Sequence, residues 1–118
     1  MKVNRGDIVL TRIPHAAGGR GKKRPGVVVQ AHMYNQSERH LIVAEITSNL
    51  TRAAEPVNLL IEILTPDGQA TGLAQDSVIT CLQLATISEQ RIDRIIGKLS
   101  PALLQKLNLC LKTMLDLP

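Results

Sequence analysis

The sequence predicts a mainly β protein, in which a small antiparallel β-barrel is followed by one C-terminal α-helix. Its apolar residues fall in many short, closely spaced runs rich in Val, Ile and Leu, which favours strands. Glycine, proline and small polar residues separate these runs. In the last stretch, residues 100–114, apolar residues recur at helical spacing. At 118 residues the chain is expected to form a single domain, residues 1–118.

Five short apolar runs are predicted as strands, and residues that interrupt regular structure bound them. Arg5-Gly6-Asp7 precedes the first run and Pro14 closes it, while Thr65-Pro66-Asp67-Gly68 turns the chain after the fourth. The polar residues 32–39 are expected to connect the second and third runs. The predicted strands are residues 8–11, 27–30, 41–47, 59–63 and 77–84.

Two segments follow the fifth run. Residues 88–99 suit both a helical face and a twisted edge strand, and periodicity leaves these alternatives open. The final stretch predicts an amphipathic helix, because Ser100 is a good N-cap and Pro101 suits the first helical position. One face of this helix is formed by Leu103, Leu107, Cys110, Leu111 and Met114.

The composition favours an anionic partner and excludes some modes of binding. The net charge is +4, which favours nucleic acid, although a merely basic protein is the alternative. Tyr34 is the single aromatic residue, which argues against a platform that stacks bases on aromatic rings, as in RRM-like and cold-shock-like folds. No apolar run approaches the roughly 18 residues of a membrane span, and no signal region opens the chain. We therefore expect a cytoplasmic protein.

Histidine and cysteine spacing is unlike that of metal or thiol sites. His15, His32 and His40 match no metal-binding pattern, so no metal or cofactor is expected. Cys81 and Cys110 lie in apolar stretches and are predicted to be buried free thiols. A histidine acid–base pair for RNA cleavage stays open as an alternative to solvated histidines in polar loops.

A basic, glycine-rich segment, residues 18–30, is the first candidate functional site. It ends in a run of valines, so a strand holds the backbone of Arg24 while its side chain faces the loop. A phosphate-binding P-loop is not expected, because the basic run opens a strand and not a helix. The alternative is a solvated charged surface. The residues expected to hold a phosphodiester backbone are Arg20, Gly21, Lys22, Lys23 and Pro25.

The polar residues Thr47, Ser48 and Asn49, at the end of the third predicted strand, are the second candidate site. Cleaving RNA without a metal needs an aligned 2'-hydroxyl, a proton acceptor, a proton donor for the leaving 5' oxygen and stabilisation of phosphate charge. The guanidinium of Arg24 fits a phosphate better than an ammonium does, and the Thr47 hydroxyl can supply a further group. Alternatively, Thr47 bonds only to its own backbone.

A series of short segments, in order and spacing, resembles a known family. The segments are Arg5-Gly6-Asp7-Ile8-Val9, Arg24-Pro25-Gly26-Val27-Val28-Val29, Met33-Tyr34-Asn35, Ala44-Glu45-Ile46-Thr47, Gly72-Leu73, Asp76-Ser77-Val78-Ile79, Gln83, Thr86-Ile87 and Arg91-Ile92. On these segments the chain resembles the MazF/PemK toxins of bacterial type II toxin–antitoxin systems over nearly its whole length.

The resemblance implies a homodimeric endoribonuclease toxin, an mRNA interferase, with an SH3-like barrel of the MazF/CcdB type. Such a toxin cuts single-stranded RNA at specific sequences without a metal, leaving a 2',3'-cyclic phosphate and a 5'-hydroxyl, and a cognate antitoxin blocks its RNA groove. The resemblance implies that Arg24 and Thr47 are catalytic and that Gln83 contacts RNA beside Ser48 and Asn49. It also implies a short helical turn at residues 88–91 and a strand at residues 92–98.

The chain departs from the family pattern at two places. Many members carry a glutamate shortly before the Arg-Pro pair, whereas residues 19–23 contain no acid. Since arginine stays protonated at neutral pH, the group that takes the 2'-hydroxyl proton is left open. Leu82 and Ala85 flank Gln83-Leu84 where members often carry charged residues, so a different cleavage sequence is expected.

Two alternatives to an RNA-cleaving toxin remain at this point. The first is a non-catalytic CcdB-like barrel that poisons a protein such as DNA gyrase. Those relatives act through an aromatic C-terminal tail, which residues 115–118 do not contain. The second is an inactive relative that binds RNA without cutting it.

Overall fold

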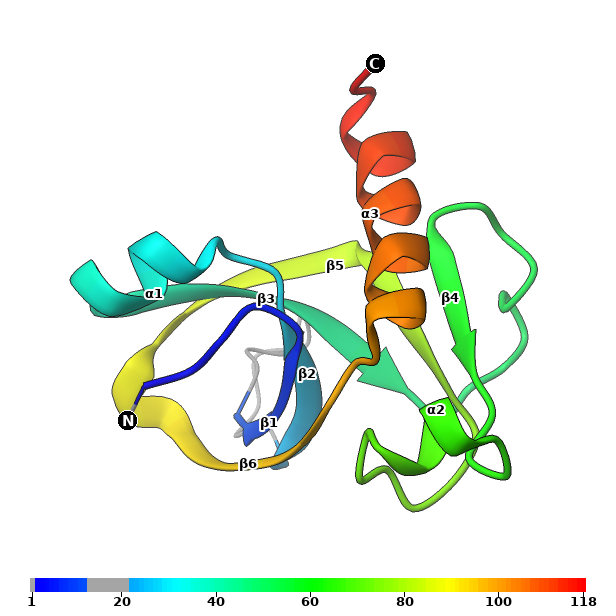
Figure 1. Ribbon diagram of the computed structural model, residues 1–118, viewed down its shortest axis with the longest axis horizontal. Helices are drawn as coiled ribbons and strands as arrows, with labels where there is room; N and C mark the ends of the chain where they lie inside the picture. The colour runs from blue at the N-terminus through cyan, green and yellow to red at the C-terminus, as the bar shows by residue number, and fades with distance from the viewer. Residues whose placement is uncertain (1, 13–21) are drawn as a thin grey trace.

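The computed structural model describes residues 2–12 and 22–118 (Figure 1). Within them, six strands form one antiparallel sheet in the order β4-β5-β3-β2-β1-β6. The strands are β1 (Asp7–Thr11), β2 (Arg24–Val28), β3 (His40–Thr47), β4 (Asn58–Ile61), β5 (Ser77–Ser88) and β6 (Ile92–Lys98). The helices are α1 (His32–Ser37), α2 (Pro66–Gln69), the 3-10 turn η1 (Glu89–Arg91) and α3 (Pro101–Leu115).

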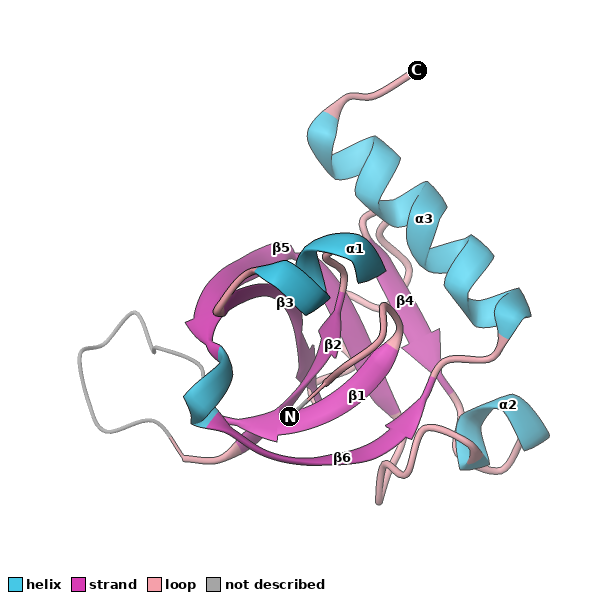
Figure 2. Ribbon diagram, turned by 60° about the vertical axis from the view of Figure 1, so that its left-hand side comes forward, coloured by secondary structure: helices cyan, strands magenta, loops and turns pink. Residues whose placement is uncertain are grey.

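The sheet curls strongly, as Figure 2 shows, and this confirms the predicted class of a small β-barrel fold with a C-terminal helix. Hydrogen bonds do not close the barrel among the described residues, because β4 and β6 are the two edges. The chain that follows β4 covers this seam instead. The Lys98 amide donates to the Ala70 carbonyl at 3.0 Å, which ties the end of β6 to the segment after α2.

Two glycines allow this segment to lie directly against β6. Gly72 has a φ of +73°, and a Cβ there would collide with the backbone carbonyl of Ile96. A Cβ on Gly97 would collide with the backbone of Thr71 in the same way. The backbones therefore approach more closely at the seam than any residue with a side chain permits.

Each face of the sheet carries a cluster of buried apolar residues, as the alternation of side chains along a strand requires. The first cluster lies between the sheet and α3 and includes Ile8, Val27, Ile46, Ile79 and Leu107. The second lies on the other face, inside the curl, and its buried members are Val3, Val9, Val28, Leu41, Val43, Ile87 and Ile92. Because both faces are covered along much of the sheet, several strands are nearly continuous apolar runs.

The final helix begins as predicted. The Ser100 hydroxyl accepts from the Leu103 amide at 3.2 Å, and Pro101 occupies the first turn. Met114, which was predicted to lie on the apolar face of this helix, is 39% exposed. It lies in the last turn, where α3 extends past the sheet (Figure 1). Within residues 2–12 and 22–118, none of these helices has the length and apolar character needed to cross a membrane.

Several predicted boundaries are wrong. β2 begins at Arg24 and ends at Val28, β4 stops at Ile61, and β5 continues to Ser88. The predicted turn at residues 65–68 is taken up by the single-turn helix α2, capped by the Thr65 hydroxyl. Residues 32–37, expected to be a connection, form α1. For residues 88–99, the turn and strand that the family resemblance implied are confirmed as η1 and β6.

The two cysteines are buried free thiols in the cluster under α3, as predicted. Burial raises the pKa of Cys81 to about 12, with the neighbouring Cys110 adding to the effect, and burial also raises the pKa of Cys110. The thiolate, which is the reactive form, is therefore disfavoured at both positions.

We expect a thiol-reactive disulfide reagent at pH 8 to leave the native protein unmodified and to label both cysteines after denaturation. The folded pKa of Cys81 exceeds its ordinary value of 9.0. The contribution that the buried neutral thiol makes to the free energy of unfolding is therefore fully present below pH 9. It is lost as the pH rises from 9 towards 12, which denaturant titrations across this range measure. Rapid labelling of either cysteine in the native protein at pH 8 would contradict the burial described here.

Candidate active site

Strand register brings Arg24 and Thr47 together. β2 and β3 are antiparallel and pair Gly26 with Glu45 and Val27 with Ala44. Continuing this register by two residues in each strand places Arg24 opposite Thr47. Opposite residues project from the same face of a sheet, so the two side chains face the same way. The two residues that the sequence marked separately therefore belong to one candidate site.

Arg24 and Thr47 both line an open groove of about 720 Å³, which we call the basic groove. Its other polar and charged lining residues are Lys22, Lys23, Ser48, Gln75, Ser77 and Arg94. Lys23 is held at the groove by Asp93, with 3.2 Å between Nζ and Oδ1. Four cations and no acid line the groove among the described residues, so it attracts a polyanion.

Thr47 also lines a second, smaller cavity of about 220 Å³, which we call the polar cavity. Its described lining residues are Glu45, Thr47, Asn49, Arg52, Asn58, Val78, Thr80, Leu82 and Gln83. Among the residues that the structure describes, Thr47 is the one that lines both spaces. A chain molecule bound in the basic groove thus passes the mouth of a cavity whose lining is largely amides and hydroxyls.

The Thr47 hydroxyl accepts a hydrogen bond from the Asn49 amide at 3.1 Å, which is the local backbone contact that the sequence offered as the alternative role. A hydroxyl has one donor hydrogen and two acceptor lone pairs. The bond from Asn49 uses a lone pair only. Thr47 therefore caps the turn after β3 and keeps its own hydrogen for another acceptor, such as a phosphate oxygen.

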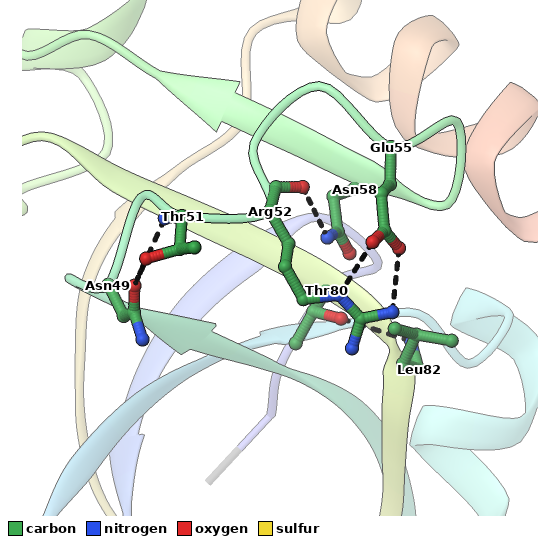
Figure 3. A network of polar contacts seen from close by, with 7 residues as sticks. All are labelled: Asn49, Thr51, Arg52, Glu55, Asn58, Thr80 and Leu82. Atoms are coloured by element: carbon green, nitrogen blue, oxygen red, sulfur yellow. Dashed lines mark hydrogen bonds and ion pairs between the residues drawn. The ribbon is translucent and has the colours of Figure 1, made fainter.

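Polar contacts hold the loop between β3 and β4 above the polar cavity (Figure 3). The Arg52 guanidinium donates to both oxygens of Glu55, at 2.6 and 2.8 Å, and the Asn58 amide donates to the Arg52 carbonyl at 2.8 Å. This pair lowers the pKa of Glu55 and raises the pKa of Arg52. At the cavity wall, Asn58 Oδ1 is buried without a hydrogen-bond partner among the described residues.

Glu45 adds an acid beside this site. Its Oε1 lies 3.5 Å from Arg24 Nη1, and the side chains of Glu45 and Arg24 are 20% and 38% exposed. Sequence reasoning missed Glu45 as a functional residue. The sequence did indicate it, because Glu45 is a charged residue inside the apolar run of residues 41–46. It is two residues from Thr47 and so projects from the same face of the strand.

The predicted site residues fall into three groups. Arg24, Thr47, Lys22, Lys23, Pro25 and Ser48 line the basic groove, and Asn49 and Gln83 line the polar cavity with Thr47. Arg20 and Gly21 lie outside the described residues. The histidine alternative loses two of its members, because His32 begins α1, His40 begins β3, and neither lines the groove or the cavity. In the described part of the chain, no three His, Cys, Asp or Glu residues gather as metal ligands would.

Comparison with known proteins finds a family and relatives that match nearly the whole chain. The family model for the PemK-like, MazF-like toxin of type II toxin–antitoxin systems matches residues 4–115. "Endoribonuclease EndoA" of Bacillus subtilis is 31% identical over 118 residues, covering 99% of this chain and 97% of that protein. "Endoribonuclease MazF6" of Mycobacterium tuberculosis is 29% identical over 119 residues, covering 99% of this chain and 100% of that protein.

Solved structures share the fold. The Mycobacterium tuberculosis toxin MazF-mt6 superposes with a TM-score of 0.76 at 21% identity, covering 95% of this chain and 98% of that one. An endoribonuclease in complex with its cognate antitoxin, from a mycobacterial species, gives a TM-score of 0.76 at 20% identity, covering 98% and 97% of the two chains. With the family model matching almost its full length, the chain belongs to the PemK-like, MazF-like toxins of type II toxin–antitoxin systems.

Proposed function

We propose that this chain is an endoribonuclease toxin that cleaves single-stranded RNA at specific sequences without a metal ion. The observation that carries the proposal is that Arg24 and Thr47 line the same groove, which four cations line in all. The names of the relatives support it, since EndoA and MazF6 are called endoribonucleases. They favour this function over the gyrase-poisoning alternative.

The groove suggests how the reaction proceeds. The 2'-hydroxyl attacks the adjacent phosphorus, the 5' oxygen leaves, and a 2',3'-cyclic phosphate and a 5'-hydroxyl remain. Arg24 stabilises the charge that grows on the non-bridging oxygens, and the Thr47 hydroxyl donates to one of them. Lys22 and Lys23 hold flanking phosphates beside Pro25 and Ser48. Arg20 and Gly21, outside the described residues, are proposed to extend this contact along the strand.

The polar cavity is proposed to contribute to sequence recognition. Asn49 and Gln83 carry amides that present both donors and acceptors, and the edge of an unstacked base offers the same groups in return. With aromatic residues almost absent from the chain, recognition depends on these hydrogen bonds and on shape. The cleavage sequence is set by the base whose edge forms hydrogen bonds with the residues of the polar cavity beside Thr47.

The proposed partners are RNA, a cognate antitoxin and a second copy of the chain, all acting in the cytoplasm. A structural neighbour was solved with its cognate antitoxin, which supports an antitoxin for this protein too. An acidic antitoxin segment fits the basic groove by charge. Exposed apolar side chains on α3, namely Leu109, Met114 and Leu115, support association into a homodimer.

The function is tested by incubating purified protein with a mixed RNA pool in EDTA and sequencing the 5'-hydroxyl ends. We expect discrete fragments that share a short sequence at the cut, and 3' ends that carry a cyclic phosphate. The same pool made with 2'-deoxynucleotides should stay intact, since the nucleophile is then missing. Intact RNA in the wild-type reaction, or cutting of the deoxy pool, would overturn the proposal. RNA binding without cleavage would identify the inactive RNA-binding relative.

A further inference from the structure

The position of Glu45 in β3 turns its carboxylate towards the active site. Its neighbours Ala44 and Ile46 are buried in the cluster under α3. Because side chains alternate along a strand, Glu45 projects from the opposite face, which is the face of Thr47. With its side chain 20% exposed, the carboxylate is reached by solvent and stays within the rim of the polar cavity.

The Glu45 carboxylate is held in place by Arg24. On β2, Gly26 lies directly opposite Glu45 and offers no side chain, so Arg24 reaches Glu45 from the diagonal position. The contact joins Nη1 and Oε1 at 3.5 Å. An isolated carboxylate would repel an RNA phosphate, whereas this one lies against the cation that binds the phosphate. Glu45 is thus tolerated within a basic site.

The surroundings leave Glu45 as the proton acceptor by elimination. Of the described residues that line the basic groove and the polar cavity, Glu45 is the sole carboxylate, and no His, Cys or Tyr lines either space. The arginines and lysines there are donors without an acceptor atom, and hydroxyls and amides are weak bases at neutral pH. Attack by a 2'-hydroxyl nevertheless needs a group that takes its proton.

We propose that Glu45 is the catalytic base of RNA cleavage, an assignment that rests on the endoribonuclease function proposed above. Glu45 takes the 2'-hydroxyl proton while the 2' oxygen bonds to phosphorus. The bond from phosphorus to the 5' oxygen breaks, its electron pair stays on that oxygen, and water supplies the proton that completes the 5'-hydroxyl. Glu45 returns its proton to solvent, so no net charge or electron is left on the protein. Arg24 stays protonated throughout.

The charged groups that face Glu45 come from β2 and from the loop after β3. Arg24 faces it from β2, and Arg52, paired with Glu55, faces the same cavity from the loop after β3. β4 and β5 contribute the neutral side chains of Asn58, Thr80 and Gln83. Neither arginine has an acceptor atom, so neither competes with Glu45 for a proton.

The test is single-turnover cleavage of an RNA whose cut site has been mapped. Glu45→Gln, which keeps the shape of the side chain, should cleave about 100-fold or more slowly. Glu45→Asp should retain more activity than Glu45→Gln. Glu62→Gln, the same change at an exposed position that lines neither space, should match the wild type.

Binding separates a chemical role from a structural one. RNA with a single 2'-deoxynucleotide at the cut site is not cleaved, and Glu45→Gln should bind it within about threefold of the wild type. Weaker binding in step with slower cleavage would overturn the assignment, as would cleavage by Glu45→Gln within about threefold of the wild type. Slow cleavage by His15→Gln together with wild-type cleavage by Glu45→Gln would identify His15 as the base. Wild-type protein that leaves the RNA intact overturns the endoribonuclease function itself, and this assignment with it.

Discussion

Replacing Arg24 with alanine is expected to slow RNA cleavage by about 100- to 1,000-fold, the cost of removing one preorganised donor from a developing anionic charge. Arg24 lies opposite Thr47 at the basic groove, and no other described guanidinium occupies that position in the register. Arg24→Lys should recover little of the loss, because an ammonium cannot reproduce the planar fork. Single-turnover rates on a mapped RNA give both values.

Two observations decide whether that loss is chemical. Arg39→Ala removes the same charge at an exposed position outside the groove and the cavity, and it should cleave at the wild-type rate. The folded state should be retained, since the half-exposed ion pair of Arg24 with Glu45 is worth less than about 1 kcal/mol. If Arg24→Ala cleaves RNA as fast as Arg39→Ala does, Arg24 has no role in catalysis.

The largest expected effect on stability is that of Leu107→Ala in α3. Leu107 is 0% exposed and packs in the cluster between the helix and the sheet. Truncating a fully buried leucine leaves a cavity and typically costs 2–5 kcal/mol, so we expect the free energy of unfolding to fall by about 3 kcal/mol. Urea denaturation followed by far-ultraviolet circular dichroism measures the change.

A matched leucine makes this prediction specific. Leu64, in the segment after β4, is 89% exposed, and Leu64→Ala should change the free energy of unfolding by less than about 0.5 kcal/mol. Equal losses from the two substitutions would mean that α3 does not pack on the sheet as described. Protein concentration must be the same in all titrations, because a dimer couples unfolding to dissociation.

The fold class followed from local signals, whereas several boundaries depended on pairing. β2 starts at Arg24 because Thr11 of β1 pairs with it; the following proline favours extended backbone at Arg24 but does not by itself specify a paired strand. α1 was missed because it presents no apolar face. Its buried residue is Asn35, whose amide donates to the Gln30 carbonyl at 3.0 Å, and hydrophobic periodicity does not detect such a helix.

The sequence was enough to predict which residues belong to the candidate site, but not which of them lie close together. Arg24 and Thr47 stand out because each is polar at the end of an apolar run, and their catalytic roles remain predictions. Their meeting depends on the register between β2 and β3, which no single segment encodes. Glu45 escaped notice for the same reason, since its ion pair with Arg24 is a diagonal contact across that register. Arg20 and Gly21 remain predictions outside the described residues.

The glycines at the seam affect how mutants of such a toxin are obtained. Cells that carry a lethal toxin survive by acquiring any change that inactivates it, and survival does not reveal which property was lost. A side chain at Gly97, which lines neither the groove nor the cavity, forces the backbones of the seam apart. Surviving colonies will therefore combine two kinds of lesion. Those at Gly97 reduce the amount of intact protein in the cell, whereas those at Arg24 or Thr47 leave it abundant and inert, and an immunoblot separates them.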